Sequence, residues 1–188
     1  MNTEPLPKQS PFSMLTANQL IERLFQFVHE TGSPVDILIV GALALHTYGV
    51  SNRATRDVDA ELSGPLTPLQ EFLIRCQIPA DLTQNFSGWS IVAMPPGYRE
   101  RATVLIDQQG LRVRVLAPLD FVIAKLRRGT ELDLDDAELV ARHYHLTAVD
   151  IQSAAERALA ASPQDSTLFL FRRTVTNFCE ILSSGAPK

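Results

Sequence analysis

The 188-residue sequence predicts an α+β fold, in which a mixed β-sheet flanked by helices is followed by a C-terminal helical portion. Short β-branched runs between turn residues fall within the first 116 residues, and two of them form a clear hairpin pattern. From Pro118 onward, apolar residues recur at helical spacing. Because strands occupy the first part of the chain and helices dominate the rest, the pattern favours the α+β class.

The composition is that of an ordinary globular protein, with 45% hydrophobic and 20% charged residues. The formal net charge of −4 excludes a surface that is basic overall, so any nucleic-acid site must be a local basic patch. The expected organisation is a flexible lead-in over residues 1–14, an α/β core over residues 15–130, and helices packed on that core over residues 131–188.

The two cysteines, Cys76 and Cys179, stand far apart without metal-ligand spacing, which indicates reduced thiols. No apolar run approaches the roughly 18–20 residues of a membrane span, and the N-terminus lacks a signal-peptide pattern. We therefore expect a cytoplasmic protein without membrane contact.

The first part of the chain holds helices and strands in turn. Thr16 can cap a helix with one apolar stripe, and Gly32-Ser33-Pro34 ends it. The β-branched run before Gly41 reads as a buried strand. In order, we expect a helix after Thr16, a strand over 37–40, a short helix over 42–48, a strand over 57–62 and a helix after Pro65.

The middle of the chain contains the hairpin. Trp89–Ala93 is the best strand candidate before it, and Met94–Gly97 is a loop because of its Pro-Pro-Gly run. Two strand-like runs over 101–106 and 111–116 are separated by the turn residues 107–110.

Helices follow the hairpin to the end of the chain. Pro118 suits the first turn of a helix, and Gly129-Thr130 breaks it. The later helices are expected near residues 133–143, 148–161 and 166–182.

Asp57 and Asp59 are the main candidates for chemistry. Side chains alternate across a strand, so these two carboxylates project from one face while Val58 points the other way. Adjacent carboxylates repel unless a cation lies between them, and Mg²⁺ is the simplest such ion. Taken alone, Asp-x-Asp is more often a solvated strand edge or a turn. The preceding strand, glycine turn and helix favour the metal site, because a helix N-terminus beside the carboxylates can receive phosphate.

The run Val35–Leu62 resembles the nucleotidyltransferase superfamily with the DNA polymerase β-like fold, and the likeness extends more weakly to about residue 145. That superfamily joins a glycine turn to an Asp-x-Asp strand. The segment is most similar to the AbiEii-type and MenT-type toxin–antitoxin branches, which carry Arg-x-Ser/Thr-x-Asp-x-Asp. The matching residues are Gly41 and Ala42 in the turn, and Arg53, Thr55, Asp57 and Asp59 in the motif.

The resemblance implies a role for each matched residue. Asp57 and Asp59 would hold Mg²⁺, and Gly41, Ala42 and the amides that follow would hold the β- and γ-phosphates of an NTP. Arg53 would balance phosphate charge, and Thr55 would steady the loop.

Lys125 and the acids that follow it form a second candidate set. From the residues alone, Lys125 lies on a solvated helix face and Asp133 favourably begins a helix. Toxin-type nucleotidyltransferases carry a lysine after the last strand and then Arg/Lys-Asp-x-x-Asp. Lys125 resembles the first, and Asp133 and Asp136 match the acids of the second, although Leu132 replaces the basic residue. The resemblance implies that Lys125 neutralises triphosphate charge and that Asp133 orients it or approaches the metal.

Four arginines near the hairpin, Arg99, Arg101, Arg112 and Arg114, are either scattered surface residues or a path for phosphate or RNA. Related enzymes place a third carboxylate on a later strand. The strand over 111–116 has no acid, and Asp107 in the expected turn is a poor substitute.

Two functions remain open from the sequence. One is a Mg²⁺-dependent enzyme that transfers NMP from an NTP to a hydroxyl of RNA, such as tRNA, or of a protein, in a toxin–antitoxin or phage-defence setting. The other is a catalytically degenerate module that binds a nucleotide or a partner. The missing third acid favours the second, and the intact Asp57–Asp59 pair favours the first.

Overall fold

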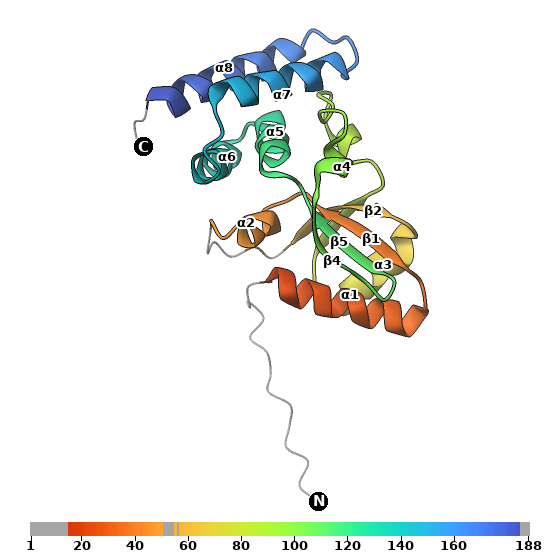
Figure 1. Ribbon diagram of the computed structural model, residues 1–188. Coiled ribbons are helices and arrows are strands. Elements are labelled where there is room, and N and C mark those ends of the chain that lie inside the picture. Colours follow the sequence, from red (N-terminus) through yellow and green to blue (C-terminus); the bar gives the residue numbers. More distant parts are fainter. Residues whose placement is uncertain (1–14, 51–54, 56, 185–188) are drawn as a thin grey trace, which may run out of the picture.

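A computed structural model describes residues 15–50, 55 and 57–184 of the chain. Its centre is a five-stranded sheet with the strand order β3-β2-β1-β5-β4 (Figure 1). The strands are β1 (Val35–Ile39), β2 (Val58–Ser63), β3 (Ala80–Thr83), β4 (Thr103–Gln108) and β5 (Leu111–Val115).

The sheet is mixed, as the sequence predicts. β1 pairs antiparallel with β2 and parallel with β5, β2 pairs parallel with β3, and β4 and β5 form the antiparallel hairpin. Strands β1 and β2 therefore lie side by side at the centre, and the end of β1 meets the start of β2.

The two faces of the sheet differ in chemistry. One face is apolar and is covered by α1 (Ala17–Thr31) and α3 (Leu66–Arg75), whose Phe27 and Phe72 rings meet edge to face at 5.3 Å (Figure 1). The strand register puts the charged residues on the opposite face, because paired residues of neighbouring strands point the same way. That polar face carries Asp36, Asp59, Glu61, Asp81, Arg112 and Arg114.

The remaining helices gather mainly at one end of the sheet, where α5 to α8 lie above α2 in Figure 1. Helix α5 packs against α6, α7 and α8. Threonine side chains cap α1, α6 and α7, as the sequence predicts for the first of them. The elements are α2 (Leu43–Thr47), the 3₁₀ helix η1 (Phe86–Trp89), α4 (Tyr98–Arg101), α5 (Pro118–Arg128), α6 (Glu131–His143), α7 (Ala148–Ala160) and α8 (Leu168–Ser184).

Two details of the predicted strands are wrong. Residues 89–93 form no strand; the strand of this region is β3, and η1 and α4 follow it before β4. The hairpin turn is the two-residue Gln109-Gly110, both with positive φ, so Asp107 lies inside β4. A two-residue turn with positive φ at both positions matches the right-handed twist of the two strands.

Within the described part of the chain, every helix is too short or too polar to cross a membrane. Cys179 is buried and Cys76 is partly buried, and both are free thiols.

Candidate functional site

Asp59 lies directly against the glycine turn that follows β1. The Asp59 carbonyl accepts hydrogen bonds from the amides of Val40 (2.9 Å) and Gly41 (3.3 Å). A Cβ on Gly41 would lie 2.4 Å from Asp59 Oδ2 and 2.5 Å from Asp59 Cβ. Only glycine permits this approach. The glycine turn and the Asp-x-Asp strand therefore pack directly against each other. The Gly41 amide already donates to the Asp59 carbonyl. The role of Gly41 and Ala42 in holding phosphate stays a prediction.

Asp57 lies just before β2 and is exposed. Its carboxylate accepts a hydrogen bond from the hydroxyl of the buried Thr55. Thr55 is 5% exposed, and its Oγ1 donates to Asp57 Oδ1 at 3.1 Å. The Thr55 carbonyl in turn accepts from the amide of Leu15 at 3.1 Å, which ties the loop to the start of α1. The geometry agrees with a loop-steadying role for Thr55. Arg53 lies outside the described residues.

Asp81 is an acid that the sequence analysis missed. It lies in β3, and its Cα is the register partner of Asp59, so the two side chains share the polar face. The strand over 111–116 has no acid, as the sequence shows, and Asp81 adds a negative charge near Asp59 without completing a three-acid metal site among the described residues. The only signal of Asp81 in the sequence is an acid in a short run after α3, and this run is a strand only through its pairing with β2.

Charges of both signs surround Asp59. Burial, followed by the negative charge of Asp57, raises the pKa of the Asp59 carboxyl above its ordinary value. Asp81 acts in the same direction, whereas Arg128 and Lys125 oppose it. The Asp59 carboxyl is thus within electrostatic reach of two acids and of two cations carried by α5.

Lys125 is buried against two acids of α6. Its Nζ donates to Asp133 Oδ1 at 3.1 Å and to Asp136 Oδ2 at 2.8 Å, and all three residues are at most 6% exposed. Burial alone would raise the pKa of Asp133, but the hydrogen bond from Thr130 and the charge of Lys125 hold it below its ordinary value. The predicted association of Lys125 with Asp133 and Asp136 is therefore present.

Arg128 was not predicted, although it acts on Asp59 more strongly than Lys125 does. Its Nε lies 3.3 Å from Asp133 Oδ2, and its side chain is 62% exposed. Arg128 thus places an exposed guanidinium beside Asp133. Arg128 lies about one helical turn after Lys125, and no motif in the sequence singles it out.

The donor set fits a magnesium ion that arrives with its nucleotide. Among the described residues, no three His, Cys, Asp or Glu side chains converge closely enough to form a metal site without other ligands. Mg²⁺ is held in phosphate-transfer sites by one or two carboxylates together with substrate phosphates and water. Asp57 and Asp59 supply two hard oxygen ligands of that kind.

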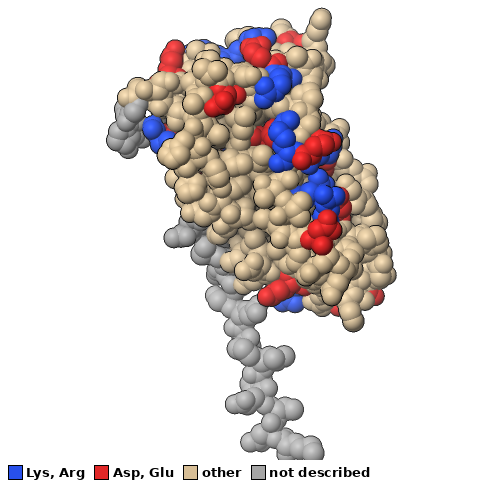
Figure 2. All heavy atoms as spheres, in the orientation of Figure 1, with Lys and Arg blue, Asp and Glu red and all other residues tan. Residues whose placement is uncertain are grey.

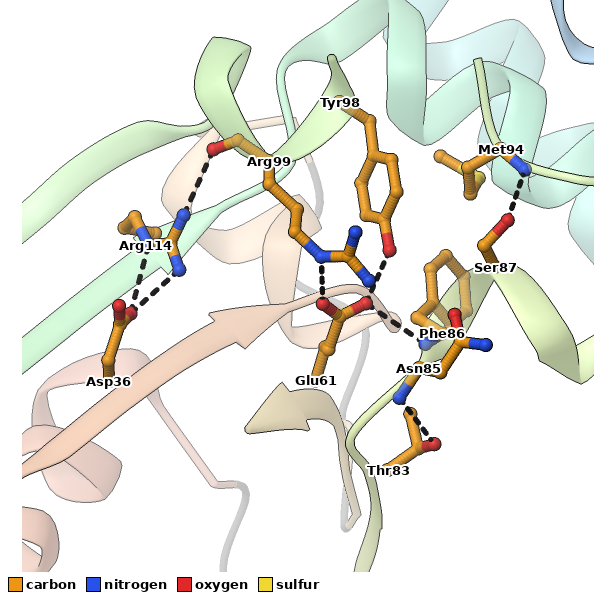
Figure 3. A network of polar contacts seen from close by, with 10 residues as sticks. All are labelled: Asp36, Glu61, Thr83, Asn85, Phe86, Ser87, Met94, Tyr98, Arg99 and Arg114. Atoms are coloured by element: carbon orange, nitrogen blue, oxygen red, sulfur yellow. Dashed lines mark hydrogen bonds and ion pairs between the residues drawn. The ribbon is translucent and has the colours of Figure 1, made fainter. Parts of the chain in front are cut away.

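Glu61 is a buried carboxylate on the same strand and face as the partly buried Asp59, and Figure 3 shows the groups that contact it. It accepts from Tyr98 Oη at 2.5 Å and from the Phe86 amide at 2.9 Å, and it pairs with Arg99 Nε. Burial, followed by the hydrogen bond to Glu61, raises the pKa of Tyr98 above its ordinary value. Glu61 is thereby occupied by the protein and serves to fix the loop between β3 and β4 over the polar face.

The four arginines near the hairpin are all paired with acids. The pairs are Arg99 with Glu61, Arg101 with Asp120, Arg112 with Asp107, and Arg114 with Asp36. Figure 2 shows positive and negative side chains interspersed on the face in view. The pairing favours the structural interpretation of these arginines over a path for RNA.

A shallow cavity of about 440 Å³ lies at the other end of the sheet, beside Pro34, Gly64 and Gly110. Asp59 and Lys125 do not line it. The cavity is open to solvent and holds none of the matched residues, so we assign the site to the carboxylates instead.

One family model of known proteins matches most of the chain. A family model described as "Nucleotidyltransferase of unknown function (DUF6036)" matches residues 17–169, which include the glycine turn, Asp57, Asp59 and Lys125. The crystal structure of JHP933 from Helicobacter pylori is similar at 14% sequence identity, with 89% of this chain and 92% of that chain covered and a TM-score of 0.36. That TM-score is too low to support a statement about this chain. No curated protein matches the chain.

Proposed function

Because the chain belongs to the family of nucleotidyltransferases of unknown function (DUF6036), we propose that it transfers a nucleoside monophosphate from an NTP to a hydroxyl group in a Mg²⁺-dependent reaction. One observation carries the proposal. Asp59 is fixed against Gly41, two residues after Asp57, and the charges of Arg128 and Lys125 act on its carboxyl. Carboxylates opposite cations form the arrangement that a metal-bound triphosphate requires.

Each group of the site has a role in this reaction. Magnesium bound with the triphosphate would supply a Lewis acid and neutralise phosphate charge. Asp57 and Asp59 would hold it, and Thr55 would orient Asp57 through the hydroxyl bond at 3.1 Å. Arg128, which is exposed, would contact the phosphates, and Lys125 would add positive charge from behind.

The bond changes follow from the substrate. The acceptor oxygen forms a bond to the α-phosphorus, the bond between that phosphorus and the bridging oxygen breaks, and pyrophosphate leaves with the negative charge. The hydroxyl proton is released to water. The acceptor is an RNA, such as tRNA, or a protein hydroxyl, and the toxin-type motif around Thr55 extends the proposal to a toxin–antitoxin or phage-defence role.

A test uses each of the four NTPs, labelled at the α-phosphate, with Mg²⁺ and either total RNA or a protein extract. We expect one NTP to give a labelled acceptor, no label from the γ-position, and no reaction in EDTA. Transfer of the γ-label instead, or no transfer from any NTP, would contradict the proposal.

The second candidate is a binding module without catalysis. The observation in its favour is that no three acids among the described residues converge on one metal position. A melting point that rises with Mg²⁺-NTP, together with no transfer to any acceptor, would select this candidate.

A further inference from the structure

Trp89 is an exposed aromatic residue at the end of η1. It is the only tryptophan in the chain, and its side chain is 42% exposed although it is one of the largest apolar groups. Its ring rests edge to face on Phe86, with centroids 5.3 Å apart, and Phe86 itself is buried. Trp89 thus packs against a buried ring and is partly exposed to solvent.

The loop that presents Trp89 is held by several side chains (Figure 3). Glu61 accepts from the Phe86 amide at 2.9 Å, and Ser87 Oγ accepts from the Met94 amide at 2.9 Å. Arg127 donates to the Ser87 carbonyl at 2.8 Å, and its guanidinium lies 5.1 Å from the centre of the Phe86 ring. Because the Arg127 guanidinium is largely buried, its pKa is lowered to about 10. Such a set of bonds fixes the direction of an exposed ring.

Two connections place this loop beside the carboxylates. Glu61, which binds the loop, lies two residues after Asp59 on the same face of β2. Arg127, which also binds the loop, lies between Lys125 and Arg128, the cations that act on Asp59. The loop that carries Trp89 is therefore bound both to the strand that holds Asp59 and to the helix that holds Lys125 and Arg128.

We propose that Trp89 is a stacking platform for a nucleobase. The inference rests on the proposed nucleotidyl transfer, because the base belongs either to the NTP or to a single-stranded RNA acceptor. An indole face stacks on any base, and a rigid, partly exposed ring loses little conformational freedom when it does so. The phosphates would lie toward Arg128 and the carboxylates, and the base would lie on Trp89.

Because Trp89 is the only tryptophan, its fluorescence reports on this ring alone. The full chain is titrated with each Mg²⁺-NTP, with tripolyphosphate, and with a short single-stranded RNA. A stacked base quenches the indole, so we expect saturable quenching by a ligand that contains a base and none by tripolyphosphate. Quenching by an NTP assigns the base to the nucleotide substrate, and quenching by RNA alone assigns it to the acceptor. Absence of quenching by both would overturn the proposal.

Variants give a second measurement that does not need fluorescence. By calorimetry, Trp89→Ala should weaken binding of the quenching ligand by about tenfold or more, whereas Trp89→Phe should weaken it by no more than about threefold. Ile91→Ala is the matched control, because Ile91 is 45% exposed on the same loop and should not affect binding. Equal affinities of Trp89→Ala and the wild type would also overturn the proposal.

The two proposals fail in different ways. Quenching without transfer of label would refute the enzymatic function and leave the stacking site in place. Label transfer with an unchanged rate and affinity in Trp89→Ala would refute the stacking site alone.

Discussion

Asp59 Oδ2 lies so close to Gly41 that a Cβ on residue 41 would stand 2.4 Å from it. The turn after β1 therefore packs directly on the start of β2. The Asp59 carboxylate can take its direction only because Gly41 has no side chain. This contact explains in physical terms why a glycine must precede the Asp-x-Asp strand.

Gly41→Ala should displace Asp59, because the new Cβ would also lie 2.5 Å from Asp59 Cβ, which is anchored to the strand. We expect a lower melting point and loss of nucleotidyl transfer. Gly49→Ala is the control: a Cβ there meets nothing within 4 Å, so only its φ of 70° is strained. That strain costs roughly 1–2 kcal/mol and should leave transfer intact. Equal activity in the two variants would refute the steric role of Gly41.

Asp59→Asn should raise the melting point at neutral pH when no Mg²⁺-NTP is present. Burial and the Asp57 charge raise the pKa of Asp59, so the folded chain binds this proton more tightly than the unfolded chain. The wild type therefore loses stability as the pH rises from the pKa of Asp59 in the unfolded chain through its pKa in the folded chain. The uncharged amide of the Asp59→Asn side chain avoids that loss. The gain should shrink below about pH 4, where aspartate is protonated in both states.

Thermal melts of Asp59→Asn and the wild type between acidic and neutral pH test this. Asp107→Asn is the control, because that carboxylate is 61% exposed and should change stability little. A variant that is less stable than the wild type at pH 7 would mean that Asp59 anchors the fold.

Lys125→Met should destabilise the chain by about 3–5 kcal/mol, since it removes the buried ammonium that Asp133 and Asp136 share, although Arg128 still lies beside Asp133. Denaturant unfolding measures the change. The control is Arg142→Ala, which removes an exposed pair with Glu138 and should cost less than about 1 kcal/mol. If the two variants lose similar amounts, the Lys125 cluster contributes no more than a surface ion pair.

The parts of the fold that the sequence predicts are those with strong local patterns. β1 is a β-branched apolar run between turn residues, and α5 begins at Pro118 with regular apolar spacing. The alternation in Asp57-Val58-Asp59 predicts Asp59 on the face opposite α1 and α3, where the register of β2 with β3 puts it, whereas Asp57 stands just before β2. Such features are fixed by residues close together in the chain.

The missed parts depend on distant partners. β3 has four residues, and its pairing with β2 rather than any local pattern makes it a strand. Residues 89–93 have a strand-like composition, but their amides bond to serine hydroxyls, as Ala93 does to Ser162 at 2.8 Å. Asp81 and Arg128 join the site only through this tertiary arrangement, so sequence spacing could not identify them.

The most direct test of the account is the rate of α-label transfer by the wild type and by Asp59→Asn, with the same NTP, Mg²⁺ and acceptor. Both proteins are first shown to be folded by their melting curves. The account predicts transfer by the wild type and a rate lower by about a hundredfold or more in the variant, because one ligand of the metal–phosphate complex is lost. A folded wild type that transfers no NMP from any of the four NTPs, or a variant that keeps the full rate, would contradict it.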